Sequence, residues 1–394
     1  MDLREKISLA PASTLRFFFI NGTVIILQIY FESLSGSSFQ IGLIQSALWG
    51  GILVFSPFWG SLADKTGRSK GILLSTMIIG ALLIPFLGFS ENIWFLLMIL
   101  TLISIFTSSF QPIILSITSK NSSKEKRGSN MSIYNSSRSL GIAAGRFFAG
   151  ILLSLFIFRD IFWIYFVVGL GAIFSTYLIP VKEDKGHISI DILKKSFKKV
   201  IPTKLGELWH ANGHKYLLIA IFLRKAAMTG VASMLAVFVT TVRDLSNAQM
   251  GLIVGVGPAI QVLFMVLFGK LVDGIGRKEI YTLGFLACST VPVIYSFSST
   301  FYGFMVGSAV LGISFSAITA GTTAFIGDIA PHSRQGEILG VRKTIQGISG
   351  VFGGLIGGII TSVLGFNYMF YSMSLLMIFG TLIAFFYTTK TMNH

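Results

Sequence analysis

Long apolar runs, separated by short polar gaps, make up most of the chain. A helix needs about 20 mostly apolar residues to cross a bilayer. Lipid permits only helices or closed barrels, because every backbone polar group must be bonded internally, and these runs do not alternate as barrel strands do. The pattern predicts twelve spanning helices: Leu15–Leu34, Phe39–Leu62, Gly71–Phe89, Ile93–Ile117, Ser132–Phe156, Ile161–Ile179, Tyr216–Val242, Gln249–Val272, Ile280–Phe297, Phe301–Ile326, Gly340–Leu364 and Phe366–Tyr387.

The composition agrees with a lipid environment. Of the 394 residues, 53% are apolar and 12% are charged, whereas a soluble domain has about 25% charged residues. A formal net charge of +15 could indicate nucleic acid, but nucleic-acid binders carry Lys and Arg on a polar face with aromatic residues between them. Here the basic residues lie in the gaps between apolar runs, so we expect a lipid bilayer and no nucleic acid as partner.

The orientation follows from where the basic residues gather. Every second gap is rich in Lys and Arg, as at Lys65, Arg68 and Lys70, whereas most of the other gaps, such as Ser90–Asn92, contain none. Basic loops stay in the cytoplasm. We therefore expect a multi-pass protein of the cell membrane with both termini in the cytoplasm, which requires an even number of helices.

A longer polar segment, residues 181–215, separates the two halves. Its lysines accompany Ile190, Leu193, Phe197 and Val200, which recur at helical spacing. This pattern predicts a cytoplasmic linker with a basic amphipathic helix on the anionic leaflet, although a solvated tether explains the composition almost as well. The predicted domains are a six-helix bundle over 1–180, the linker over 181–215 and a second bundle over 216–394.

The two halves repeat each other. A motif of glycines, an acid and a base follows the second predicted helix and returns 209 residues later after the eighth; the same offset relates Arg16 to Lys225. A constant offset indicates a duplicated six-helix unit, as in transporters built of parallel repeats. The motif residues are Gly60, Asp64, Lys65, Gly67 and Arg68 in the first copy and Gly269, Asp273, Gly276 and Arg277 in the second.

The pattern G-x3-D-[RK]-x-G-R in this position resembles the signature of the major facilitator superfamily, and the helix count, repeat and orientation extend the resemblance over the whole chain. It implies an all-α integral membrane protein with twelve transmembrane helices, arranged as two six-helix bundles related by a pseudo-twofold axis. It also implies a secondary transporter of small molecules rather than an enzyme, with no cofactor and no metal. The chain has no Walker loop that would indicate ATP-driven transport.

By the same resemblance, the motif is a conformational latch. The acid in the position of Asp64 lies against a helix N-terminus and a basic residue of the other bundle, where the macrodipole and the cation stabilise its charge. The partners here would be the start of the eleventh helix and Arg138 or Arg342. The alternative is a tight turn that only carries the positive charges of a cytoplasmic loop.

Polar residues at membrane depth are costly and mark candidate functional positions. Arg146, in the middle of the fifth predicted helix, is a candidate for binding substrate or coupling ion, or else for a structural pair. Arg224 and Lys225 we expect to extend towards the inner surface. The further candidates are Gln28, Gln111, Asn21 and Gln261 as cavity-lining residues, Glu32 as a proton site or surface carboxylate, and Asp328 and Arg334 as gating residues beside Arg138 and Arg342.

The expected activity is proton-coupled efflux of amphiphilic or drug-like compounds by a monomer, since many aromatic and apolar residues suit an apolar cavity. The pattern is closest to the drug/proton antiporter branch of the resembled family, which carries a glycine ladder with a Gly-Pro step in the fifth helix. Gly141, Gly145 and Gly150 match that ladder in part, but Arg146 stands where proline is expected. The alternatives are an organic-anion or sugar-phosphate porter that uses Arg146, a sugar porter, and a membrane receptor or scaffold that no longer transports.

Overall fold

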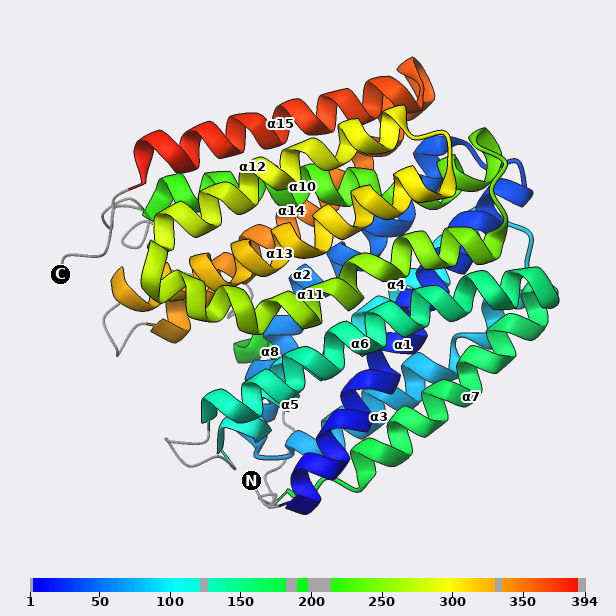
Figure 1. Cartoon of the computed structure of the whole chain (residues 1–394). Helices are drawn as coiled ribbons and strands as arrows, with labels where there is room; N and C mark the ends of the chain where they lie inside the picture. The colour runs from blue at the N-terminus through cyan, green and yellow to red at the C-terminus, as the bar shows by residue number, and fades with distance from the viewer. Residues whose placement is uncertain (1–2, 121–126, 182–189, 198–213, 330–334, 389–394) are drawn as a thin grey trace. The chain divides into compact units, whose positions relative to one another are not determined.

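The computed structural model describes residues 3–120, 127–181, 190–197, 214–329 and 335–388 (Figure 1). Every regular element in these ranges is a helix, and twelve helical stretches are long and apolar enough to cross a membrane. The predicted all-α membrane fold is confirmed. The helices of the first half are α1 Leu3–Ser33, α2 Ser38–Thr66, α3 Ser69–Leu82, the 3₁₀ turn η1 Pro85–Gly88, α4 Ile93–Thr107, α5 Phe110–Lys120, α6 Arg127–Leu155 and α7 Phe158–Tyr177.

The second half begins after a short helix, α8 Ile190–Phe197, which lies in the predicted linker. In α10–α15 the apolar residues again form long continuous runs, as lipid-exposed helices require. These helices are α10 His214–Val237 with the π-helical turn η3 Phe238–Val242, α11 Asn247–Ile275, α12 Arg277–Phe297, α13 Phe301–Ile329, α14 Gln335–Leu364 and α15 Phe366–Tyr387.

By their internal contacts the residues form two compact units. The first comprises 1–30 and 47–203, and the second comprises 31–46 and 204–394. Helix α2 is therefore divided: its first residues pack with the second unit, although they lie within the first predicted bundle. In the second unit, α15 packs against α10 and α12, and α13 packs against α11 and α12 (Figure 1).

Glycines set how closely the first helix of each unit approaches its neighbours. In the first unit, a side-chain carbon on Gly145 of α6 would collide with the backbone carbonyl of Phe18 in α1, and one on Gly22 would overlap the ring of Tyr165. The hydroxyl of Tyr165 donates to the carbonyl oxygen of Gly145 at 2.8 Å. Small residues let helix backbones meet in this way when lipid offers no hydrophobic driving force.

The second unit repeats these contacts with a different numbering offset. Gly353 of α14 meets the carbonyl of Ala226 in α10 just as Gly145 meets Phe18, and Gly230 meets Met373 just as Gly22 meets Tyr165. Each pair is separated by 208 positions, as 353 − 145 and 373 − 165 show, and not by the 209 that relates the two motif loops. Arg16 therefore corresponds to Arg224, and the predicted correspondence with Lys225 is wrong by one residue.

The predicted linker helix has a contact of its own within the first unit. Phe197, at the end of α8, stacks on Phe58 of α2 with ring centroids 4.3 Å apart and meets Phe55 at 6.1 Å. Ile190, at the other end, is 71% exposed. The helix thus has an aromatic anchor on α2; its placement on the anionic leaflet stays a prediction.

Candidate functional site

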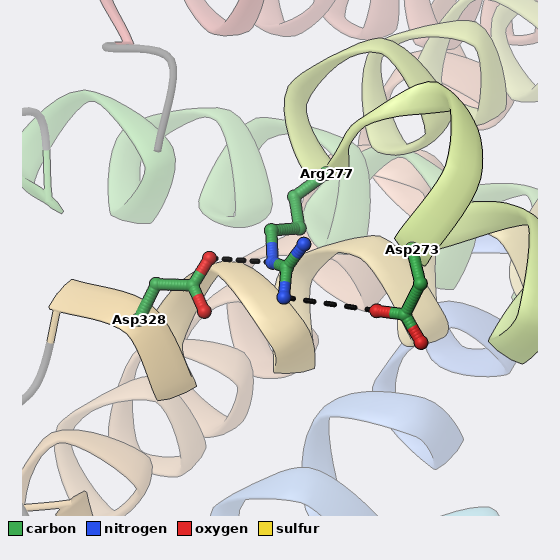
Figure 2. A network of polar contacts seen from close by, with 3 residues as sticks. All are labelled: Asp273, Arg277 and Asp328. Atoms are coloured by element: carbon green, nitrogen blue, oxygen red, sulfur yellow. Dashed lines mark ion pairs between the residues drawn. The ribbon is translucent and has the colours of Figure 1, made fainter. Parts of the chain in front are cut away.

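The second copy of the motif forms a charge network at one end of its unit. Helix α11 ends at Ile275, Gly276 turns the chain with φ 122°, and α12 begins at Arg277. Arg277 lies 2.5 Å from a carboxylate oxygen of Asp328 in α13 and 3.7 Å from one of Asp273 (Figure 2). The Asp273 side chain is 75% exposed, whereas those of Arg277 and Asp328 are 18% and 29% exposed. Asp328 is therefore the stronger partner, and the network joins three helices.

The first copy also turns at a glycine with positive φ, but the turn is one residue longer and its acid has a different partner. Gly67 adopts φ 67° between α2 and α3, a conformation that a residue with a Cβ disfavours. Asp64 is exposed and accepts a hydrogen bond from the hydroxyl of Ser116 in α5 at 3.4 Å. The position 208 residues before Asp328 is Lys120, so this unit has a base where the second has the acid.

The two leading glycines of the motif also differ. A Cβ on Gly60 would lie 3.2 Å from Pro112, whereas one on Gly269 would meet nothing within 4 Å. Close helix packing therefore explains why position 60 is a glycine, but it does not explain the glycine at position 269. The side chain of Lys65 is exposed beside the turn.

The predicted latch partners have contacts within their own units. Arg342 donates through Nη1 to the hydroxyl of Thr323 in α13 at 3.3 Å. The guanidinium carbon of Arg138 lies 5.6 Å from the ring centroid of Phe17. Arg334 lies outside the described residues. The latch itself, between Asp64 and the other bundle, stays a prediction.

A buried arginine that the motif does not include lies in the first unit. The fourth predicted helix is interrupted at Ser108 and Ser109, because Pro112 has no N–H for the carbonyl four residues earlier and its ring crowds that carbonyl. Arg16, only 6% exposed, donates through Nη2 to the carbonyl oxygen of Thr107 at 2.7 Å. A cation thus lies at the C-terminal end of α4, where the helix dipole favours it.

The second unit has a matching buried arginine. Arg224 is 5% exposed, lies 5.0 Å from the ring centroid of Phe315, and hydrogen-bonds the side chain of Cys288. The prediction that Arg224 extends to the inner surface is wrong. The reason is the packing of α10: the side chain points among α12 and α13, where aromatic rings provide cation–π contacts in place of water.

The uncharged and remaining charged candidates are spread along several helices. Gln28 is completely buried in α1, and the amide of Asn21 donates to the carbonyl of Phe17 in its own helix at 2.9 Å. Gln111 and Gln261 are half-buried, as is Arg146. Glu32 is half-buried in the last turn of α1.

Comparison with known proteins decides the family. The model of the Major Facilitator Superfamily matches residues 9–273 and 217–393. The chain belongs to the major facilitator superfamily. It is therefore a membrane transporter of small molecules rather than an enzyme, and the predicted resemblance is confirmed.

Two relatives within the superfamily are named for multidrug resistance. The chain is 25% identical over 383 residues, 92% of each chain, to the multi-drug resistance efflux pump PmrA of Streptococcus pneumoniae. It is 24% identical to the multidrug resistance protein MdtG of Proteus mirabilis, over 86% of this chain and 81% of that protein.

Solved structures confirm the fold at lower identity. The nucleoside transporter NupG matches with a TM-score of 0.76 and 14% identity over 98% of this chain and 100% of its own. The human organic anion transporter MFSD10 matches with a TM-score of 0.70 and 12% identity over 98% of this chain and 100% of its own. At such identity these structures speak to the superfamily fold alone.

Proposed function

We propose that this transporter exports amphiphilic or drug-like small molecules in exchange for protons, by rocker-switch alternating access, as a monomer in the cell membrane with both termini in the cytoplasm. The observation that carries the proposal is the likeness to a multidrug efflux pump over 92% of both chains. Such coverage includes both units and both motif loops, so the likeness extends beyond one shared domain.

The geometry of the motif loops supports a transporter that changes conformation. Arg277 joins the ends of α11, α12 and α13 through its contacts with Asp273 and Asp328. Bonds of this kind let three helices move as one body, as a rocking bundle requires. In the first unit, Asp64 is exposed just before the motif turn, and we propose that it makes the latch contact.

Glu32 is our candidate for the proton site. Glu32 is half-buried in the last turn of α1, one residue before the end of the first candidate span, Ser8–Ser33. A partly buried carboxylate is costlier when charged than an exposed one, so protonation and release can be tied to a change of conformation.

The test is dye transport in proteoliposomes of the purified protein. We expect ethidium to move against a concentration gradient when an opposing proton gradient is imposed, and the movement to stop when a protonophore collapses that gradient. Glu32→Gln should abolish the proton-driven component. The matched control is Glu91→Gln, which removes an exposed carboxylate just before α4 and should transport normally. Dye movement that ignores the proton gradient would contradict the coupling, and no dye movement above empty liposomes would contradict the proposed substrate class.

Organic-anion transport is the second candidate. Arg146 was its predicted receptor, and its half-buried side chain remains compatible with that role. The specific observation that favours an anionic substrate is the buried Arg16 in the first unit, whose guanidinium has no carboxylate partner among the described residues.

A further inference from the structure

The buried guanidinium of Arg16 has N–H donors that lack acceptors. Its Nη2 donates to Thr107, but its Nε and Nη1 are buried and no described residue accepts a hydrogen bond from either. Leaving a buried donor without an acceptor is costly, and most costly when the donor is charged. The guanidinium also lies 5.3–5.8 Å from the ring centroids of Phe17, Phe19 and Phe110, which supply cation–π contacts but no acceptor atom.

A second unsatisfied donor belongs to a residue that packs against Phe17, the neighbour of Arg16 in the chain. Tyr134 of α6 is 1% exposed, and its buried hydroxyl has no hydrogen-bond partner among the described residues. The ring of Tyr134 packs edge-on against Phe17 at 6.4 Å, and the charges of Arg16 and Arg138 both act on its hydroxyl. Two helices therefore each bring a buried donor without a described acceptor against the same ring, that of Phe17.

Arg138 adds a second positive charge on the same ring. Its guanidinium carbon lies 5.6 Å from the centroid of Phe17, and that of Arg16 lies 5.5 Å from it. Two positive charges beside one ring make the surroundings favourable for a negative charge. Guanidinium and phenol N–H and O–H groups fit the oxygens of a carboxylate or phosphate, which accept several hydrogen bonds at once.

We propose that Arg16, Tyr134 and Arg138 bind the anionic oxygen group, carboxylate or phosphate, of an amphiphilic ligand, with the surrounding phenylalanine rings against its apolar part. The inference deepens the proposed function, on which it rests for the ligand being a transported solute, because it makes anionic amphiphiles substrates. The same chemistry could come from the headgroup of an anionic lipid. Since Arg16 and Tyr134 are buried, the ligand enters when the helices part, as they do in a transporter that alternates between conformations.

The first arm of the test measures binding in detergent, where no transport is needed. Three probes are compared with purified protein by ligand-dependent thermal stabilisation and calorimetry: 2-naphthoate, the neutral 2-naphthalenemethanol, and inorganic phosphate. We expect 2-naphthoate to stabilise the wild type, as any ligand that binds only the native state does, and to bind more tightly than the neutral alcohol. Phosphate should compete with it, because it offers the same oxygens without the apolar part.

The variants separate recognition of the anion from structural support. Arg16→Gln and Tyr134→Phe should each weaken 2-naphthoate binding by roughly tenfold or more, the loss expected for a charge-assisted hydrogen bond. Arg16→Lys keeps the charge but not the planar fork, and should recover only part of the affinity. The matched control is Arg159→Gln, which removes an exposed arginine of the same unit that contacts Asp160 at 3.7 Å and should bind as the wild type does.

The second arm identifies the source of the anion. The protein is placed in nanodiscs of phosphatidylcholine alone or with added phosphatidylglycerol, without naphthoate. If phosphatidylglycerol stabilises the wild type but not Arg16→Gln, the site holds a lipid headgroup; if only naphthoate distinguishes the two proteins, the site holds a solute. Either result supports the anion site.

The proposal is overturned if folded Arg16→Gln and Tyr134→Phe bind 2-naphthoate and respond to phosphatidylglycerol as the wild type does. A loss of stability in these variants without any change in ligand response would also overturn it, because that is the result of a purely structural arginine. Ethidium transport is a separate readout. Anion binding without dye transport would contradict the proposed efflux function and would still support the anion site. Dye transport without anion binding would support the efflux function and contradict the anion site.

Discussion

Helix α14 crosses the first residues of α2 inside the second unit, and this crossing yields our sharpest prediction. A Cβ on Gly354 would lie 2.6 Å from Oγ of Ser46 and 2.7 Å from the carbonyl oxygen of Gly42. Ser46 also donates to the carbonyl of Val351 at 2.8 Å. The two backbones meet with only the hydroxyl of Ser46 beside them, so even a methyl group has no room.

The expected cost of Gly354→Ala follows from these distances. Ordinary van der Waals contact begins at 3.4 Å, so the carbonyl of Gly42 would have to retreat by about 0.7 Å from the new methyl group, or the helices would have to part. Inserting a methyl group into a well-packed contact costs about 1–3 kcal/mol. If the contact opens and closes in the native protein, its closed population falls by roughly 5- to 150-fold relative to the open one.

The assay uses the fact that the chain has one cysteine, Cys288, which is buried. In a Cys288→Ser background, a cysteine at position 38, the first residue of α2, reports by its rate of maleimide labelling whether α2 stays packed on α14. We expect Gly354→Ala to raise this rate at least fivefold, the lower end of the estimated range. The matched control is Gly340→Ala on the same helix, where a Cβ meets nothing within 4 Å. Equal labelling rates in the two variants would refute the packing argument.

Three further predictions concern the motif loops. Asp328→Asn should lower the unfolding free energy of the second unit by about 1–2 kcal/mol, because Arg277 loses its close and partly buried partner. Asp273→Asn should lower it by less than about 0.5 kcal/mol, because the 3.7 Å contact of Asp273 is exposed. Equal shifts in melting temperature would contradict this ranking. Gly276→Ala should cost about 1–2 kcal/mol, since φ is 122° and a Cβ would meet the carboxylate of Glu279; a melting temperature like that of the wild type would argue against strain at the turn. Asp64→Asn should shift the protein towards inward-facing forms, seen as faster labelling of cysteines introduced on the cytoplasmic side, and an unchanged labelling pattern would count against the latch.

Much of the fold could be predicted because each element has a strong local signal. An apolar run of about 20 residues has few alternatives to a spanning helix, so all twelve runs were found, although their ends are displaced and the third and fourth are each divided into two helical pieces. The first run was predicted to begin at Leu15, but α1 begins at Leu3. Its polar beginning, which includes Arg4, Glu5 and Lys6, gives no hydropathy signal, since a helix can continue into water without changing its hydrogen bonds.

The interruption of the fourth helix was missed although its cause was in view. Pro112 lies inside the predicted span Ile93–Ile117, and spanning helices often keep their direction through a proline because neighbours satisfy the freed carbonyls. Here α4 ends at Thr107 and α5 begins at Phe110. At this break the carbonyl oxygen of Thr107, the last residue of α4, accepts a hydrogen bond from Nη2 of Arg16 in another helix. A contact between residues 91 positions apart cannot be read from local sequence.

The pairing of Arg16 with Lys225 failed for a related reason. The two motif loops are 209 residues apart, whereas the contacts of the first helix of each unit repeat after 208 residues. A register taken from the loops therefore misplaces positions in that helix by one. One residue turns a side chain by about 100° around a helix axis. That rotation separates a lysine expected at the membrane surface from the buried Arg224.

With the offset of 208 residues, each position in the first helix of one unit can be compared with its counterpart in the other unit. The first helix of each unit has a buried arginine, Arg16 in one and Arg224 in the other. In both side chains, Nε and Nη1 are buried and have no described hydrogen-bond acceptor. A purely structural site would be served as well or better by an apolar side chain of similar volume, since burying a charge is rarely stabilising. The surroundings have diverged: the position of Tyr134 is Arg342 in the second unit, and Thr107, which accepts from Arg16, is replaced there by Phe315. Retention of the charge with exchange of its partners is the pattern expected when the arginine acts on a ligand and its neighbours choose which one.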